Sequence, residues 1–238
     1  MLSLYHCRGA RSLRVLWTLN ELNLLRTPAE PVEYKLFALP FPPRVHDKSF
    51  IEINPLGTIP YLHHDRGPGG SPVGITESCA GPVYLASTFT HSPSQQLNVA
   101  PHEDCYAAFL NWNAHADATL TFPHTLYLRY VKFEPHKNLQ QAGEEYRKWG
   151  LSRLRLLDAT LADGREFLCS DRFTVADVNI AYALLLARGV GLEDKLQPQT
   201  LEYLRRLTAR EGYLRSLEEE RRADEEAGID PVVIFENS

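Results

Sequence analysis

The chain has 238 residues, of which 44% are hydrophobic and 23% charged, and its formal net charge is -5. This length allows one large domain or two small ones with a proper core, and the acidic balance does not favour nucleic acid as a partner. No apolar run reaches the roughly 18 residues that a membrane span needs, and we expect no signal peptide, because Met1-Leu2-Ser3 runs straight into a strand pattern. The four cysteines show neither a Cys-x-x-Cys pair nor metal-finger spacing, so we expect a reduced, cytoplasmic protein without a metal site.

Residues 1–87 are predicted to form an α/β domain. Alternating apolar residues indicate strands, and apolar residues at helical spacing indicate helices. The expected strands are 2–5, 32–37, 60–63 and 73–75, and the expected helices are 12–24 and 78–88, with a helical turn at 48–53. This order, β-α-β and then β-β-α, is that of a thioredoxin-like sheet.

Residues 88–100 are predicted to be a linker, because this stretch is polar, contains prolines and shows little periodicity. Residues 101–238 are predicted to form an all-α helical bundle. The expected helices are 103–132 (interrupted near Pro123), 139–162, 174–188, 196–210 and 213–226. Thr174 and Asp177 have the spacing of a capping box, in which each side chain satisfies an N–H group at the helix start.

The end of the chain carries two further patterns. Residues 218–226 are a run of mixed charges, which we interpret as a solvated helix face. Residues 229–235 are apolar enough that we expect them to dock on the rest of the protein.

Two short motifs indicate a binding site for a peptide-like ligand. In the run Asn54-Pro-Leu-Gly-Thr-Ile-Pro60, the last proline follows an aliphatic residue where a loop enters a strand, which favours a cis peptide bond. Such a bond would turn the backbone N–H and C=O of Ile59 outward, where an extended peptide can pair with them. Thr76-Glu77-Ser78 is predicted to begin a helix, whose free N–H groups and dipole hold a carboxylate. A peptide with its amide on Ile59 and its carboxylate at Ser78 would span both motifs.

These motifs, together with two others, resemble those of the cytosolic glutathione transferases. The matching stretches are Phe50–Leu62, Ile75–Ala80, Leu4–Trp17 and Phe173–Asp177. They follow the order found in that family and extend over most of the chain. The resemblance implies a thioredoxin-like domain that binds glutathione as co-substrate, followed by a helical domain that holds a small hydrophobic electrophile. It also implies a detoxification enzyme that forms a homodimer.

The resemblance further implies which residues bind glutathione. They are Arg11, Ile59, Pro60, Glu77 and Ser78. Of these, Glu77 and Ser78 would hold the γ-glutamyl end, and Ile59 would contribute only its backbone. The glycyl carboxylate needs a cation, for which Arg44, His46 and Lys48 are alternatives.

The first loop, which lies between the first strand and Arg14, must supply the group that acts on the sulfur of glutathione, because the thiolate is the nucleophile. Cys7 lies where cysteine-type transferases carry Cys-x-x-Ala; it would form a mixed disulfide with glutathione, and the helix N-terminus and nearby arginines would make it more acidic. Ser12 is the hydroxyl alternative, although Ala10 replaces the first serine of the serine-type pattern, and a helix N-cap would also explain Ser12. Tyr5 and His6 are interpreted as structural residues of the strand.

The second substrate is expected to lie against the first long helix of the helical domain. His115 and Phe122 are the candidates for this pocket, although a stripe of this kind is also typical of a core. The sequence therefore predicts a glutathione transferase. A thiol transferase or reductase that uses Cys7, and a non-catalytic binding module that retains the fold, are the alternatives.

Overall fold

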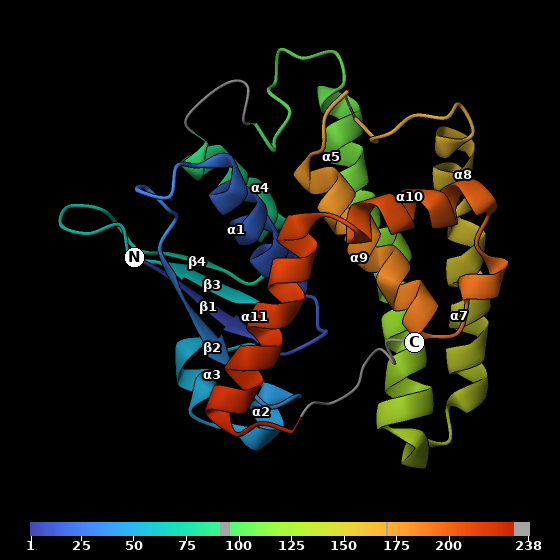
Figure 1. Cartoon of the computed structure of the whole chain (residues 1–238). Helices are drawn as coiled ribbons and strands as arrows, with labels where there is room; N and C mark the ends of the chain where they lie inside the picture. The colour runs from blue at the N-terminus through green and yellow to red at the C-terminus, as the bar shows by residue number, and fades with distance from the viewer. Residues whose placement is uncertain (91–95, 170, 231–238) are drawn as a thin grey trace. The chain divides into compact units, whose positions relative to one another are not determined.

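A computed structural model describes residues 1–90, 96–169 and 171–230 of the chain (Figure 1). These residues form two compact units. The first unit combines the part of the chain up to Asn98 with the stretch that begins at Ala209, and the second unit runs from Val99 to Thr208. Most of the apolar segment 229–235, whose docking was expected, lies outside the described residues, and so does the middle of the expected linker.

The first unit is built on a four-stranded sheet with the strand order β2-β1-β3-β4. The strands are β1 (Leu2–His6), β2 (Tyr34–Ala38), β3 (Tyr61–His64) and β4 (Val73–Ile75). β1 pairs parallel with β2 and antiparallel with β3, and β3 pairs antiparallel with β4. Because β1 and β2 are parallel, the chain crosses between them through α1 (Leu13–Leu25). The predicted α/β fold of the first domain is confirmed.

Helix α1 is the most deeply enclosed helix of the first unit. α4 (Ala80–Phe89) and α11 (Glu211–Ala227) both pack against it (Figure 1), and every residue from Leu13 to Leu22 is buried. This buried stretch includes Arg14, Asn20 and Glu21. Since buried polar groups are costly unless they are hydrogen-bonded, α1 requires polar partners on its neighbours. The remaining helices of this unit, α2 (Pro43–His46) and α3 (Phe50–Ile53), are single turns that precede β3.

Helix α11 is not the fully solvated face that the mixed charges of residues 218–226 indicated. Its buried side towards α1 includes four residues spaced by four: Gly212, Ser216, Glu220 and Asp224. The opposite side is exposed, and there Arg221 pairs with acidic neighbours on its own helix. The solvated-face interpretation of residues 218–226 was therefore wrong at Glu220 and Asp224. Glu220 is buried beside His6 Nε2 and the Gly9 N–H, whereas the buried carboxylate of Asp224 has no hydrogen-bond partner among the described residues. By its contacts α11 belongs to the first unit, whereas the sequence assigned it to the helical domain.

The second unit is helical, as predicted. Its helices are α5 (Tyr106–Ala114), α6 (Phe122–Tyr127), α7 (Gln140–Arg153), α8 (Arg155–Leu161), α9 (Val175–Gly189) and α10 (Pro198–Thr208), with the π-helical segments η2 (His115–Thr121) and η3 (Leu128–Phe133) and the 3-10 turns η4 (Pro135–Lys137) and η5 (Glu193–Lys195). α9 is the core of this unit, and all its residues from Val175 to Ala187 are buried. The predicted capping box of Thr174 and Asp177 is present at its start.

The expected interruption at Pro123 is a change of helix type. Proline has no N–H to donate and crowds the preceding turn. Here the helix widens before the proline, and the N–H of Phe122 bonds to the C=O of Asp117, five residues back. Such a wide turn lets the helix pass the proline without a break, so α5, η2 and α6 follow one another directly.

Candidate active site

The register of the sheet brings three of the predicted site segments to one end of the first unit. Tyr5 pairs with Tyr61, and Leu62 pairs with Ile75. Because β1 and β4 both run antiparallel to β3, the residues that follow β1, precede β3 and follow β4 lie at the same end of these strands. The first loop, Ile59-Pro60 and Glu77-Ser78 are therefore neighbours.

The loop before β3 is held by a buried asparagine. Asn54 is 1% exposed, and its side-chain amide donates to the C=O of Thr58 at 2.7 Å. The Ile59–Pro60 peptide bond is cis, as predicted. The pairing of β1 with β3 begins at Tyr61, so the backbone of Ile59 belongs to the loop and not to the sheet ladder.

Ser78 connects the start of α4 to α1. The Arg14 guanidinium donates from Nη1 to Ser78 Oγ at 2.6 Å, and both residues are buried. The C=O of Glu77 accepts from the N–H groups of Ala80 and Gly81, so the helical turn begins here although α4 itself starts two residues later than predicted. Glu77 is exposed. The two residues thus combine a fixed hydroxyl group with a carboxylate that faces solvent.

Cys7 and Ser12 interact within the first loop. Ser12 Oγ accepts from the Cys7 N–H and donates to the Cys7 C=O, in both cases at 3.3 Å. Hydroxyl hydrogen bonds are usually shorter than this, so these contacts hold the hydroxyl weakly. Ser12 makes no side-chain cap to α1, which removes the N-cap explanation for it. Both residues are buried, with Cys7 1% and Ser12 0% exposed.

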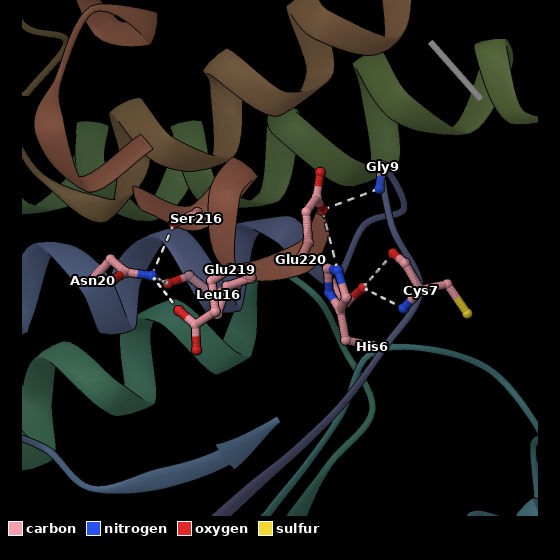
Figure 2. A network of polar contacts seen from close by, with 9 residues as sticks. His6, Cys7, Gly9, Leu16, Asn20, Ser216, Glu219 and Glu220 are labelled. Carbon is pink, nitrogen blue, oxygen red and sulfur yellow. Dashed lines mark hydrogen bonds and ion pairs between the residues drawn. The ribbon is translucent and has the colours of Figure 1, made fainter. Parts of the chain in front are cut away.

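The thiol of Cys7 is not acidic in this environment. Burial, and after it the charge of Asp224, raises the pKa of the Cys7 thiol to about 12. The expected gain in acidity was wrong, because removing the thiolate from water outweighs any help from the helix N-terminus or from nearby arginines. At neutral pH Cys7 is a protonated thiol, and Figure 2 shows its sulfur pointing away from Glu220.

One contact that the sequence analysis missed joins the first loop to α11 (Figure 2). Glu220 Oε2 accepts from the N–H of Gly9 at 3.2 Å and lies 3.1 Å from His6 Nε2. His6 is 0% and Glu220 3% exposed, so this is a buried contact. The available signal was the spacing of small and acidic residues in α11, but a spacing does not tell which element the helix faces.

The three cation candidates lie near the loop before β3. Arg44 and His46 are on α2, Lys48 follows it, and all three are exposed. Arg44 is packed against the 54–58 loop, since a Cβ atom placed on Gly57 would lie only 2.7 Å from Arg44 Cβ. Gly57 also has a φ of 58°, so this close approach and the backbone conformation both favour glycine there.

Tyr5 and Arg11 complete the candidates of the first unit. The ring of Tyr5 stacks on Phe37 with 4.9 Å between the centroids, which fits its interpretation as a structural residue. Arg11 is half-buried in the turn that leads into α1.

A comparison with protein families identifies this unit. Residues 4–80 match the family model described as "Glutathione S-transferase, N-terminal domain". The match runs from β1 to the start of α4 and includes every segment at the end of the sheet described above. Residues 4–80 are thus similar to the N-terminal domain of glutathione S-transferases.

Solved glutathione transferases share the fold of nearly the whole chain. One from Methylococcus capsulatus has 21% identity, covers 93% of this chain and 100% of its own, and has a TM-score of 0.73. A glutathione transferase family member from Pseudomonas fluorescens with two glutathione bound has 23% identity, covers 91% of this chain and 92% of its own, and has a TM-score of 0.73. A sphingomonad glutathione S-transferase complexed with glutathione has 20% identity, covers 92% of this chain and 98% of its own, and has a TM-score of 0.72. No curated protein matches the sequence significantly.

The two residues predicted to line a pocket for the electrophile lie in the second unit. His115 begins η2 and Phe122 follows its end. Phe122 is 49% exposed. The ring of His115 packs edge-on against Trp112 with 5.4 Å between the centroids, and burial lowers the pKa of His115. Phe122 therefore exposes apolar surface, whereas His115 is partly engaged within its own unit.

Among the described residues, no three His, Cys, Asp or Glu side chains gather closely enough to hold a metal ion. In the same part of the chain, no helix has both the length and the apolar composition for crossing a bilayer. None of the four cysteines, all of which lie in the described part of the chain, forms a disulfide.

Proposed function

We propose that this protein is a glutathione transferase, which stabilises the thiolate of bound glutathione for attack on a hydrophobic electrophile. One observation carries the proposal: the first loop, Ile59-Pro60 and Glu77-Ser78 lie at the same end of the sheet. Glutathione needs partners for its thiol, its peptide backbone and its γ-glutamyl end, and these three segments offer them. The relatives from Pseudomonas fluorescens and a sphingomonad hold glutathione, which supports the same ligand here.

In the proposed complex, glutathione lies along the loop before β3. Its cysteinyl backbone pairs with Ile59 as an added strand. Its γ-glutamyl carboxylate accepts from the N–H and hydroxyl groups of Ser78, and its ammonium group pairs with Glu77. We assign the glycyl carboxylate to Arg44, because Arg44 packs against Gly57, two residues from Ile59.

We assign the thiolate-stabilising role to Ser12. Its weak contact with the Cys7 C=O, at 3.3 Å, leaves the hydroxyl able to turn towards a better acceptor, and a thiolate is one. Cys7, with a pKa of about 12, stays protonated at neutral pH and is a poor nucleophile. During conjugation the glutathione sulfur forms a bond to carbon, the leaving group departs with its electron pair, and the thiol proton passes to solvent.

Calorimetric titration with glutathione and a conjugation assay with chlorodinitrobenzene test the proposal. We expect Ser12→Ala to lower kcat on the order of a hundredfold, and Cys7→Ser to keep most of it. If conjugation instead survives in Ser12→Ala, and Cys7→Ser abolishes reduction of a glutathione mixed disulfide, the protein is a thiol transferase. If glutathione does not bind even at millimolar concentration, the proposal is refuted in favour of a non-catalytic module.

We also propose that the enzyme is a cytoplasmic homodimer. On α7 and α8 the side chains of Tyr146, Trp149 and Leu156 are 38%, 43% and 48% exposed, and apolar surface of this kind is often covered by a partner. Cysteines without a disulfide fit a reducing compartment. Sedimentation equilibrium at micromolar concentration should give twice the chain mass for the wild type and the mass of one chain for Trp149→Glu. A monomeric wild type would contradict the proposal.

A further inference from the structure

Helix α11 brings carboxylates to the first loop and to the sheet. Glu219 and Glu220 are adjacent, and they reach different targets. Glu219 accepts from the Tyr34 hydroxyl of β2 and from the side-chain amide of Asn20 on α1. Glu220 reaches the first loop instead. Both residues therefore attach α11 to other parts of the first unit, but of the two only Glu220 contacts the segment that contains Cys7 and Ser12.

The contacts of Glu220 lie on both sides of Cys7. His6, whose Nε2 is 3.1 Å from Glu220 Oε2, is the last residue of β1, and Gly9, whose N–H donates to the same oxygen at 3.2 Å, lies in the turn that follows. A buried carboxylate that accepts two hydrogen bonds holds its donors more strongly than a neutral acceptor does. Because Gly9 has a φ of 68°, the backbone at this point has a conformation that few other residues adopt. The carboxylate thus fixes the path of the backbone around Cys7.

The same path determines where Ser12 lies. The C=O of Cys7 accepts from the Ala10 N–H at 3.1 Å and from the Ser12 hydroxyl. A change in the backbone at Gly9 therefore moves the group to which the Ser12 hydroxyl is bonded. Catalytic donors must be held close to their productive geometry to be effective.

We infer that Glu220 is a positioning residue for the reaction: through His6 and Gly9 it holds the first loop in the geometry that presents the Ser12 hydroxyl to the glutathione sulfur. This inference rests on the proposed function. Glu220 does not itself touch the ligand; it acts through the loop.

Kinetics of three variants separate positioning from stability. Glu220→Leu should lower kcat roughly tenfold and raise the pKa of the bound glutathione thiol by about one unit, read from thiolate absorbance, with little change in KM for glutathione. Glu220→Gln keeps an acceptor oxygen and should retain most of kcat. Glu219→Leu is the matched control, since it loses the contacts with Tyr34 and Asn20 but should leave the thiol pKa and kcat unchanged. If Glu220→Leu and Glu219→Leu lower the melting temperature equally and neither changes kcat, Glu220 is only structural and the inference is overturned.

A second measurement does not require glutathione. The rate at which iodoacetamide alkylates Cys7, followed by mass spectrometry, reports on the closed state of the loop, and Cys169, which is also buried, is an internal reference in the second unit. In Glu220→Leu we expect Cys7 to react roughly tenfold faster and Cys169 at its wild-type rate. An unchanged Cys7 rate would show that Glu220 does not hold the loop. Faster alkylation of Cys7 in a protein that does not bind glutathione would refute the proposed function while supporting the positioning of the loop by Glu220.

Discussion

Ser78 has a structural contact as well as a proposed ligand contact, and the substitution Ser78→Ala perturbs both. The substitution removes the acceptor of the Arg14 Nη1 hydrogen bond, which is 2.6 Å long and joins residues that are 0% and 4% exposed. A hydrogen bond to a charged group contributes about 2 kcal/mol to stability. Since the partner is a buried guanidinium, we expect the free energy of unfolding to fall by about that amount.

Glu77→Gln is the matched control for this experiment. Glu77 is adjacent in sequence but exposed, so we expect a change of about 0.5 kcal/mol or less in the free energy of unfolding. Both substitutions should weaken glutathione binding roughly tenfold, because each removes one polar partner of the γ-glutamyl group. Ser78→Ala should therefore affect stability and affinity, and Glu77→Gln affinity alone.

Urea denaturation followed by far-UV circular dichroism, and calorimetric titration with glutathione, provide the two readouts. If Ser78→Ala unfolds at the same urea concentration as the wild type, the buried bond to Arg14 does not stabilise the first unit and the structural argument is wrong. If both variants bind glutathione as tightly as the wild type, the ligand does not use the start of α4.

Three further substitutions test the electrostatics of buried groups. Asp177→Ala removes an acceptor of hydrogen bonds from Thr174, Leu168 and Tyr203; we expect a loss of about 4 kcal/mol in urea denaturation, and a loss under 1 kcal/mol would contradict the capping role. Burial lowers the pKa of His124 to about 4 from 6.5. The free energy of unfolding should therefore fall by about 3 kcal/mol as the pH drops from 6.5 to 4, and the fall should be smaller in His124→Leu. Burial raises the pKa of Asp224, so ionisation of its carboxyl lowers stability as the pH rises through the raised value. Asp224→Asn should therefore have a higher melting temperature than the wild type at pH 7 and the same melting temperature at about pH 3. A lower melting temperature of the variant at pH 7 would show that the charge of Asp224 stabilises the fold.

The features that the sequence predicted correctly depend on local signals. The cis bond at Pro60 and the capping box of Thr174 and Asp177 are each specified by a few neighbouring residues. The four strands follow from apolar alternation, which reflects a sheet with one face buried. The antiparallel pairing of β3 with β1 and with β4 then brings the first loop, Ile59 and Ser78 to one end of the sheet.

The features that the sequence did not predict depend on contacts between distant parts of the chain. Glu220 is 214 positions from His6, and its surroundings in the sequence are the same mixed charges that cover exposed helices. The neighbours of Cys7 in the loop indicate an acidic thiol, whereas burial by the folded unit determines the pKa of Cys7. Desolvation is a property of the whole fold, and a local pattern does not contain it.

The return of α11 to the first unit has a consequence for the order in which the protein is made. Residues 99–208 separate the two stretches of that unit, so the ribosome completes the second unit before the first has all its parts. Until α11 is synthesised, Asn20 lacks Ser216 and Glu21 lacks Arg210. A fragment that ends at Asn98 would expose this polar face of α1 without its partners. A chimera that exchanges the first unit between proteins of this fold must therefore transplant two separate stretches of chain.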